Sequence, residues 1–385
     1  MSLSSASDRS RLVIRRGLCR RAALLGAALT ALLSTSCTTR DDSYWIGAVG
    51  QYAGDEAAHE NMRGILLAVR QLNQAGGIHG HPVRLVMKDD GGRGDAAARI
   101  AHLFVADKRI SVVVGHTTSA AMIAAAPVYD NHLVAIATTA SAPALTGISP
   151  WVFRVIPSDS VTGAQLAHFA ASRGWRRAAV LYENDVYGRG LADAFTGAFR
   201  GIVLSVDPIV PDSADLSTFV RFYERFKPDV IFVITRPSYV PASLREGLAQ
   251  KHLPVAIVAS EGSTDLERDV GRAEGIYTSA PFSSLSTGAD RGKFTRDYVA
   301  AFGNPPKEEA ALAYDAAITA FAALAAVGPH RAAIRRYMRA LDNDAAPVGA
   351  TGPIYFDSVG DRRALGGVLL QVRAGHVVVL SDTLR

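Results

Sequence analysis

Short apolar runs alternate with amphipathic segments of helical length along this chain from Tyr44 onward. The runs at 111–115 (SVVVG) and 230–234 (VIFVI) are apolar at almost every position, and helical patterns such as 60–75, followed by Gly76 and Gly77, lie between such runs. A strand that is apolar throughout is buried on both faces, which happens when helices cover both sides of a parallel sheet. The alternation therefore predicts an α/β fold built on doubly wound parallel sheets.

The alternation occurs in two similar series, which predicts two lobes. The first series ends near Pro157 and the second near residue 259, and the C-terminal part carries helical and then strand-like segments that complete both lobes. Ligands of open parallel sheets bind at the carboxyl ends of the strands, so two such sheets that face each other suit the capture of a small molecule. We predict one lobe from residues 44–158 with 283–362, and the other from residues 159–282 with 363–385.

The first 36 residues have the organisation of an export signal. Several arginines precede the apolar core 22–33 (AALLGAALTALL), and small residues lead to Cys37. This order describes a secretory signal, and the apolar core is too short for a membrane-spanning helix, which needs about 20 residues. The ending resembles a bacterial lipobox, with Ser34 where leucine is usual. We expect residues 1–36 to be a signal peptide, Cys37 to be lipidated, and residues 37–43 to be a tether that holds the protein in the periplasm or cell envelope.

Charge and cysteine content exclude several classes of partner and cofactor. Residues 1–36 hold six arginines and one acid, so the rest of the chain has 35 basic and 35 acidic residues and a formal net charge of zero. A neutral chain is not a candidate for binding nucleic acid or anionic membranes through its charge. The two cysteines, Cys19 and Cys37, both lie in the leader region. We therefore expect no disulfide and no thiolate metal site in the mature protein.

No catalytic motif is present. The chain has no nucleophile elbow, zinc-protease helix, phosphate-binding loop or dinucleotide fingerprint. The glycine-rich segment 89–95 (DDGGRGD) lacks the Lys-Ser/Thr ending of a phosphate loop, which predicts a surface loop, and the histidines have no metal-ligand spacing. We expect a protein without enzymatic activity, cofactor or metal. A secreted α/β hydrolase is the alternative from another class, and the missing nucleophile–base pair argues against it.

Polar residues follow four of the predicted strands. On the first lobe, strand 111–115 leads to Ser119 and strand 133–137 leads to Thr139 and Ser141; on the second, strand 178–182 leads to Tyr187 and strand 255–259 leads to Glu261. A hydroxyl at a helix N-terminus suits a carboxylate, although Ser119 would also serve as an ordinary N-cap and Glu261 as a solvated loop residue. Hydroxyl donors on one lobe and an acid with a phenol on the other complement a zwitterion.

Seven segments of the chain resemble the branched-chain amino-acid substrate-binding proteins of bacterial ABC transporters. They include IGAVG at 46–50, VVVGHTTSAAMIAAAPVY at 112–129, VFRVIPSDS at 152–160, VLYENDVYGRGLADAF at 180–195 and ASEGS at 259–263. The resemblance implies a type I periplasmic-binding fold, with two α/β lobes joined by three crossover strands that close on a ligand. It also implies a monomer that binds an α-amino acid outside the cytoplasm and delivers it to an ABC permease.

The resemblance assigns roles to five residues. Ser119 corresponds to the serine that binds the ligand carboxylate, and Ser141 to a hydroxyl residue that contacts the head group. Thr139 falls where a backbone carbonyl accepts from the ligand ammonium. Tyr187 corresponds to the tyrosine of the family's Y-G element, and Glu261 to the acid that pairs with the ammonium.

The resemblance also implies a polar side-chain pocket, since Thr117 and Thr118 stand where the Leu/Ile/Val binders have leucine and cysteine. Arg236 suits a second ligand carboxylate or, alternatively, a solvated rim. An amide, urea or an aromatic acid as ligand, or a role as a ligand sensor, is the alternative within the same fold. The remaining candidates for the pocket are Tyr52, His59, Tyr239 and Tyr314.

Overall fold

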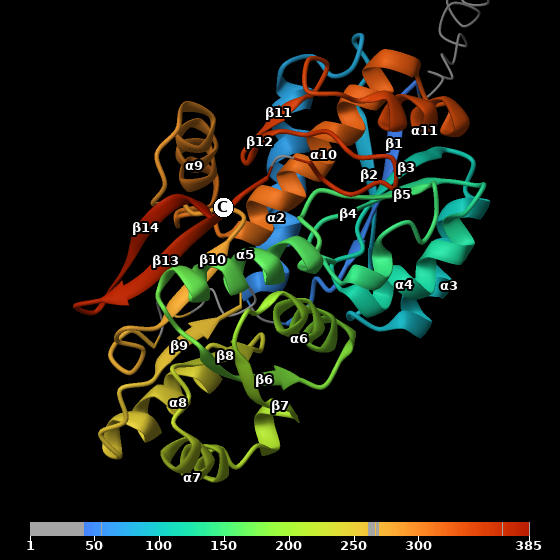
Figure 1. The fold of residues 1–385 in the computed structure, drawn as a ribbon. Helices are drawn as coiled ribbons and strands as arrows, with labels where there is room; N and C mark the ends of the chain where they lie inside the picture. The colour runs from blue at the N-terminus through green and yellow to red at the C-terminus, as the bar shows by residue number, and fades with distance from the viewer. Residues whose placement is uncertain (1–41, 55, 261–265, 267–268, 364, 385) are drawn as a thin grey trace, which may run out of the picture. The chain divides into compact units, whose positions relative to one another are not determined.

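The computed structural model describes residues 42–54, 56–260, 266, 269–363 and 365–384 (Figure 1). The leader 1–36, Cys37 and Glu261, which carry three of the predictions above, lie outside these residues.

The first lobe is built on a five-stranded parallel sheet in the order β2-β1-β3-β4-β5. β1 pairs with both of its neighbours, with Ile46 opposite Leu85 and Val112, and its register with β3 shifts by one residue between Trp45 and Ile46. The prediction of a doubly wound α/β fold is confirmed here. The strands are β1 (Tyr44–Gly50), β2 (Val83–Asp89), β3 (Ile110–Val114), β4 (Val134–Ala137) and β5 (Val152–Arg154).

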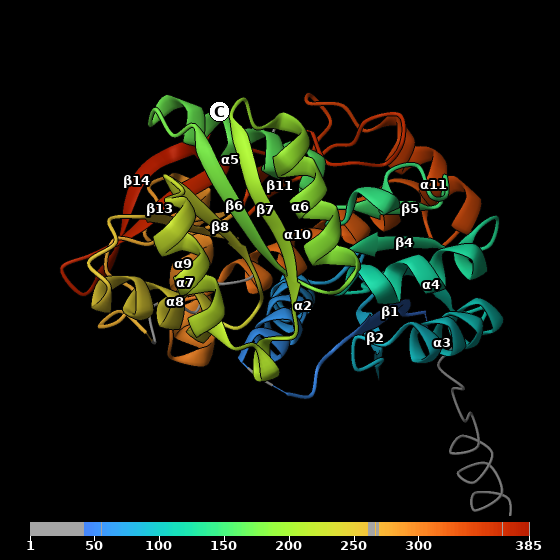
Figure 2. The ribbon, with the colours of Figure 1, turned by 60° about the horizontal axis from the view of Figure 1, so that its bottom comes forward.

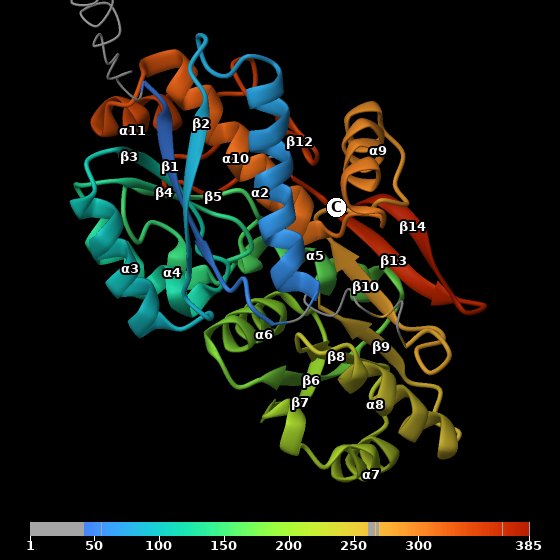
Figure 3. The same cartoon turned by 180° about the vertical axis from the view of Figure 1, so that it is seen from behind.

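Helices cover both faces of this sheet, which explains its continuously apolar strands (Figure 3). Val112 and Val114 of β3 pack in the cluster under α2 (Glu56–Gln74), α10 (Glu308–Val327) and α11 (Arg331–Ala340). Val113, between them, packs in the cluster under α3 (Gly94–Ala106) and α4 (Ser119–Tyr129), because successive strand residues point to opposite faces. α10 is long and apolar enough to cross a membrane, and here that surface is largely buried against α2 and the sheet.

The second lobe is built on a seven-stranded sheet in the order β14-β13-β10-β9-β8-β6-β7. Helices α5 (Asp159–Ser172) and α6 (Val186–Ala198) cover one face, and α7 (Leu216–Phe226) and α8 (Tyr239–Gln250) cover the other (Figure 2). The strands are β6 (Arg177–Glu183), β7 (Ile202–Ile209), β8 (Val230–Ile234), β9 (Ala256–Ala259), β10 (Tyr277–Ala280), β13 (Gly367–Arg373) and β14 (His376–Leu384).

Part of the second sheet is antiparallel, at the C-terminal strands that complete it. β13 pairs with β10 and with β14 in the antiparallel sense. β13 and β14 are joined by only two residues, Ala374 and Gly375, both with positive φ (49° and 74°). A two-residue turn of this kind connects antiparallel neighbours, whereas a parallel connection needs a crossover of a dozen residues or more.

The chain passes between the two lobes at three places within the described residues. The first crossing segment (155–158) joins β5 to α5, and the second (281–288) joins β10 to α9 (Ala289–Phe302). The third (354–366), described except for residue 364, joins β12 (Gly352–Pro353), which pairs with β11 (Val348–Gly349), to β13. The predicted domain boundaries fall in these segments and stay a prediction.

Candidate ligand-binding site

The loops at the carboxyl ends of β1, β2, β3 and β4 are hydrogen-bonded to one another. The Gln51 backbone N–H donates to Thr117 Oγ1 (3.1 Å), and Thr139 Oγ1 donates to the Thr117 carbonyl oxygen (2.7 Å). Thr118 Oγ1 donates to the Gly92 carbonyl oxygen (3.0 Å). Thr117 and Thr139 therefore brace the loops against each other, which orders this edge of the sheet without a ligand.

Ser119 is the first residue of α4 and is buried, with 3% of its surface exposed. Its Oγ accepts the Ala142 backbone N–H at 3.1 Å. The N-cap is Thr118, whose side chain accepts from the Ala121 N–H, so the N-cap alternative applies to Thr118 and not to Ser119. A serine hydroxyl has one hydrogen and two lone pairs, and the bond from Ala142 uses one lone pair, so the hydrogen of Ser119 is still able to donate. The positive end of the α4 dipole favours an anionic acceptor there.

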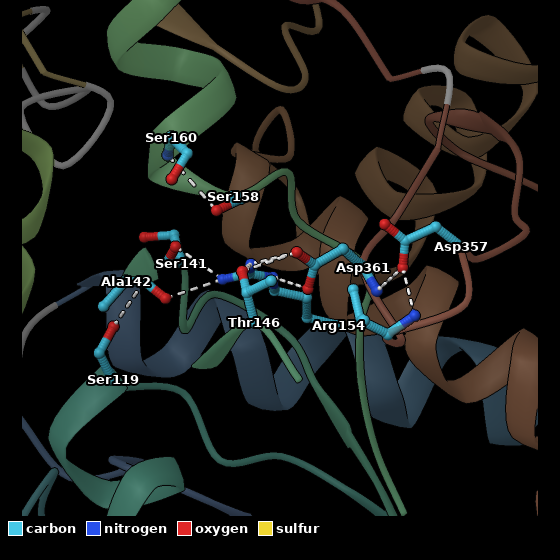
Figure 4. A network of polar contacts seen from close by, with 10 residues as sticks. Ser119, Ser141, Ala142, Thr146, Arg154, Ser158, Ser160, Asp357 and Asp361 are labelled. Carbon is cyan, nitrogen blue, oxygen red and sulfur yellow. Dashed lines mark hydrogen bonds and ion pairs between the residues drawn. The ribbon is translucent and has the colours of Figure 1, made fainter. Parts of the chain in front are cut away.

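Ser141 lies in the next loop and is almost fully buried. Its carbonyl oxygen accepts from Arg154 Nη1 (2.8 Å) and from the Asp159 backbone N–H (3.0 Å), as Figure 4 shows for Arg154. Arg154, the last residue of β5, was not among the predicted site residues. The signal was present, because an arginine within the apolar run VFRVI occupies a buried position that needs an anionic partner.

On the second lobe, Tyr187 is a buried residue in the first turn of α6, which Asp185 caps by accepting the Gly188 N–H (2.7 Å). The Arg236 guanidinium carbon lies 5.0 Å from the centroid of the Tyr187 ring. The same guanidinium pairs with Glu183 Oε1 (2.9 Å) and Asp185 Oδ2 (2.7 Å). Burial lowers the pKa of Arg236, but the two carboxylates outweigh it and raise the pKa overall.

Arg236 is thus partly solvated and already paired with two carboxylates, and its role toward a ligand stays a prediction. Its side chain is 42% exposed, and carboxylates of its own lobe already occupy it. A ligand carboxylate would have to displace them.

β9 ends beside β8. Ser260, fully buried, donates its backbone N–H to the Val233 carbonyl (3.0 Å) and its hydroxyl to the Thr235 carbonyl (3.5 Å). Glu261 follows Ser260 in the sequence and lies outside the described residues, so its role stays a prediction.

The loop of Ser141 and the helix of Tyr187 are in contact. The short helix η1 (Pro143–Leu145) follows Ser141 and Ala142 and packs on α6. A Cβ added at Gly190, one turn beyond Tyr187, would lie 2.7 Å from Pro143 Cδ, so glycine permits this approach. The structure therefore brings Ser119, Thr139 and Ser141 together and places the helix of Tyr187 against them.

Among the other pocket candidates, Tyr52 directly follows Gln51 in the loop after β1 and Tyr314 lies on α10, and their role in a pocket stays a prediction. Tyr52 is buried in the core beneath α2 and α10, where burial and then Asp90 raise its pKa. Tyr314 on α10 donates its hydroxyl to Gln71 Oε1 (2.8 Å) and lines a groove of about 430 Å³ between α10 and α2. His59 is half-buried on α2.

Tyr239 lies at the N-terminus of α8 and is 38% exposed. Its hydroxyl donates to Asp212 Oδ1 at 2.7 Å. This hydrogen bond, followed by burial, raises the pKa of Tyr239 to about 12. Tyr239 is thus hydrogen-bonded within its own lobe, to Asp212 in the segment that follows β7.

A buried polar network beneath the loops was not predicted. His116 Nδ1 lies 2.5 Å from Asp90 Oδ2, and His116 Nε2 lies 3.0 Å from the Tyr129 hydroxyl. Asp90 Oδ1 accepts the Gly92 N–H (2.8 Å), so the network fixes the loop after β2. The predicted surface loop 89–95 is therefore wrong for Asp90, which is 2% exposed.

Comparison with known proteins adds three findings. A family model described as periplasmic binding protein matches residues 44–375. An amino acid binding protein of Pseudomonas aeruginosa is 31% identical over 180 residues, 45% of this chain and 48% of the relative. A Leu/Ile/Val-binding protein of Rhizobium johnstonii is 31% identical over 217 residues, 54% of this chain and 58% of the relative. The chain thus spans about half the length of the curated relatives it matches.

Among solved structures, an ABC transporter substrate-binding protein of Desulfitobacterium hafniense in complex with Leu has a TM-score of 0.78 and 28% identity. The match covers 88% of this chain and 100% of that one.

Proposed function

This chain belongs to the periplasmic binding protein family, and from that premise we propose that it is the extracytoplasmic solute-binding component of an ABC importer with an α-amino acid as ligand. The observation that carries the proposal is the hydroxyl of Ser119, which accepts from Ala142 and keeps its hydrogen for an anion at the N-terminus of α4. The Leu ligand of the Desulfitobacterium protein and the names of the two relatives support the same ligand class.

The mechanism is binding rather than turnover. The first lobe binds the carboxylate through Ser119, Ser141 and backbone N–H groups of their loops. The second lobe then brings Tyr187 and Glu261 to the ammonium. A ligand that contacts both lobes favours the closed state, because only there are both of its charges paired.

The same proposal assigns roles to the N-terminal leader and to a membrane partner. Residues 1–36 direct export, Cys37 carries the lipid anchor, and the closed monomer delivers its ligand to the membrane subunits of an ABC permease. Mass spectrometry of the membrane-extracted protein tests the anchor: a diacylated N-terminal Cys37 is the expected result, and an unmodified N-terminus elsewhere would contradict it.

A thermal-shift screen of the mature chain tests the ligand class. Amino acids, amides, urea and aromatic acids are compared, since only a true ligand stabilises the folded state by mass action. We expect an amino acid to raise the Tm. A response confined to urea, amides or aromatic acids would assign the alternative ligand within the same fold.

A further inference from the structure

Arg154 is a buried arginine whose five N–H donors are all used (Figure 4). Nε and Nη2 form a bidentate pair with Asp361 at 2.7 and 2.6 Å, and Nη2 also donates to Thr146 Oγ1 (2.5 Å). Nη1 donates to the carbonyl oxygens of Ser141 (2.8 Å) and Ala142 (2.9 Å). Paired, planar geometry of this kind holds its partners in one orientation, because displacing any of them leaves buried polar groups unsatisfied.

Asp361 belongs to the third crossing segment, in the part that still packs on the first lobe: Phe356 and Leu365 lie in the core cluster under α2 and α10. That segment is itself fixed here, since the Asp361 N–H donates to Asp357 Oδ1 (2.9 Å) and the Arg154 N–H donates to the Gly360 carbonyl (3.1 Å). Arg154 therefore joins the loop of Ser141 in the first lobe to a segment that leads into the second lobe.

The first crossing segment reaches the same peptide unit. Asp159, which begins α5 of the second lobe, donates its N–H to the Ser141 carbonyl that Arg154 also holds. On the other side of that peptide, the Ala142 N–H donates to Ser119 Oγ. The peptide between Ser141 and Ala142 is thus a junction of the candidate carboxylate site with two of the three crossing segments.

We propose that Arg154 and Asp361 are positioning residues that couple the carboxylate site to the hinge. This inference rests on the proposed function. Arg154 holds the Ser141–Ala142 peptide so that Ser119 is oriented as a donor, and Asp361 makes that orientation depend on the third crossing segment. Movement of the crossing segments on closure then shifts the groups that bind the ligand carboxylate. In turn, a carboxylate bound there restrains the crossing segments.

The neighbouring residue supplies a matched control. Arg362 is also buried in the third crossing segment, 3.8 Å from Asp315, and it donates to the carbonyls of Val155 (3.2 Å) and Pro353 (2.7 Å). None of these contacts reaches Ser141 or Ala142. A substitution at Arg362 therefore disturbs a buried ion pair of the same segment without releasing the peptide.

The test measures hydrogen exchange of the Ala142 amide in the ligand-free mature chain, for wild type, Arg154→Lys, Asp361→Asn and Arg362→Lys. Lysine keeps the charge of Arg154 but cannot form the bidentate pair. We expect the exchange rate of the Ala142 amide to rise at least about tenfold more in Arg154→Lys and Asp361→Asn than in Arg362→Lys. The rates are compared after allowing for the loss of Tm in each variant. Equal exchange in all three variants would overturn the proposal.

A milder variant covers the case in which these proteins do not fold. Thr146 is exposed, and Thr146→Val removes only the hydroxyl that braces Arg154 and Asp361. The same rise at Ala142, smaller in size, is expected, and unchanged exchange would count against the coupling.

Calorimetry with L-leucine forms a second arm. Arg154→Lys should weaken binding about tenfold or more, with Arg362→Lys within about twofold of wild type. Failure of wild type to bind L-leucine would bear on the proposed function, whereas the exchange of Ala142 decides the coupling without any ligand.

Discussion

His116 and Asp90 form a buried pair beneath the candidate site, with Nδ1 and Oδ2 2.5 Å apart. His116 follows β3 and Asp90 follows β2, so the pair joins the two loops from below. The loops after β2 and β3 are therefore held by a polar network inside the core.

Asp90→Asn should destabilise the fold, because asparagine lacks the charge that strengthens the bond to His116. We expect the free energy of unfolding to fall by about 1.5–3 kcal/mol in urea denaturation. Asp95→Asn is the control, since Asp95 is exposed in its pairs with Arg93 and Arg99 and should change stability little. Equal effects of the two substitutions would show that the buried pair contributes nothing special.

Ser119→Ala should weaken binding of the amino acid found in the screen by about 1.5–3 kcal/mol, the size of a hydrogen bond to a charged group. Isothermal calorimetry measures the change. Asp215→Ala is the control: loss of this N-cap of α7 costs about 1 kcal/mol of stability but lies outside the candidate site. Unchanged affinity in Ser119→Ala would remove Ser119 from the carboxylate site.

Glu261→Ala should weaken binding by about 3–5 kcal/mol, because the ligand ammonium would be left unpaired on closure. Glu274→Ala is the comparison, since Glu274 accepts the Ala374 N–H (3.1 Å) at the hairpin of β13 and β14. If both variants bind like wild type, Glu261 is not the partner of the ammonium.

Gly190→Ala and Gly197→Ala place the same methyl group at two positions of α6. Alanine is favoured over glycine within helices by up to about 1 kcal/mol, so Gly197→Ala, where nothing lies within 4 Å of the added Cβ, should stabilise the protein. Gly190→Ala should instead destabilise it and weaken ligand binding, because the methyl group meets Pro143 at 2.7 Å. Thermal unfolding and calorimetry of the pair measure this difference, and a stabilised Gly190→Ala with wild-type affinity would contradict the contact.

Tyr239 should give the folded protein an alkaline-sensitive contribution to stability. Its pKa is raised from 10.0 to about 12, first by the hydrogen bond to Asp212 and then by burial. Folding favours the protonated phenol, so this contribution is complete below about pH 10 and is lost as the pH rises through about 12. Ultraviolet difference titration should show the phenol of Tyr239 ionising earlier in Asp212→Asn, with that signal absent in Tyr239→Phe. Titration at the same pH in wild type and Asp212→Asn would disprove the assignment.

Patterns within a few residues predicted much of this fold. The run SVVVG predicted β3, buried at every position, and the hydroxyls that follow it lie at the N-terminus of α4. Local pattern failed where two distant segments meet: Asp90 is buried against His116, and Arg154 is buried against Asp361, 207 positions away.

The sequence by itself therefore determined the strands, the helices and the polar residues at the strand ends, because hydrophobic periodicity and turn chemistry act over short distances along the chain. Only the tertiary structure decided that Arg154 pairs with Asp361, 207 positions away, and that Arg154 also donates to the carbonyl oxygens of Ser141 and Ala142. A buried charge needs a partner, but which partner reaches it depends on how the lobes and their crossing segments pack.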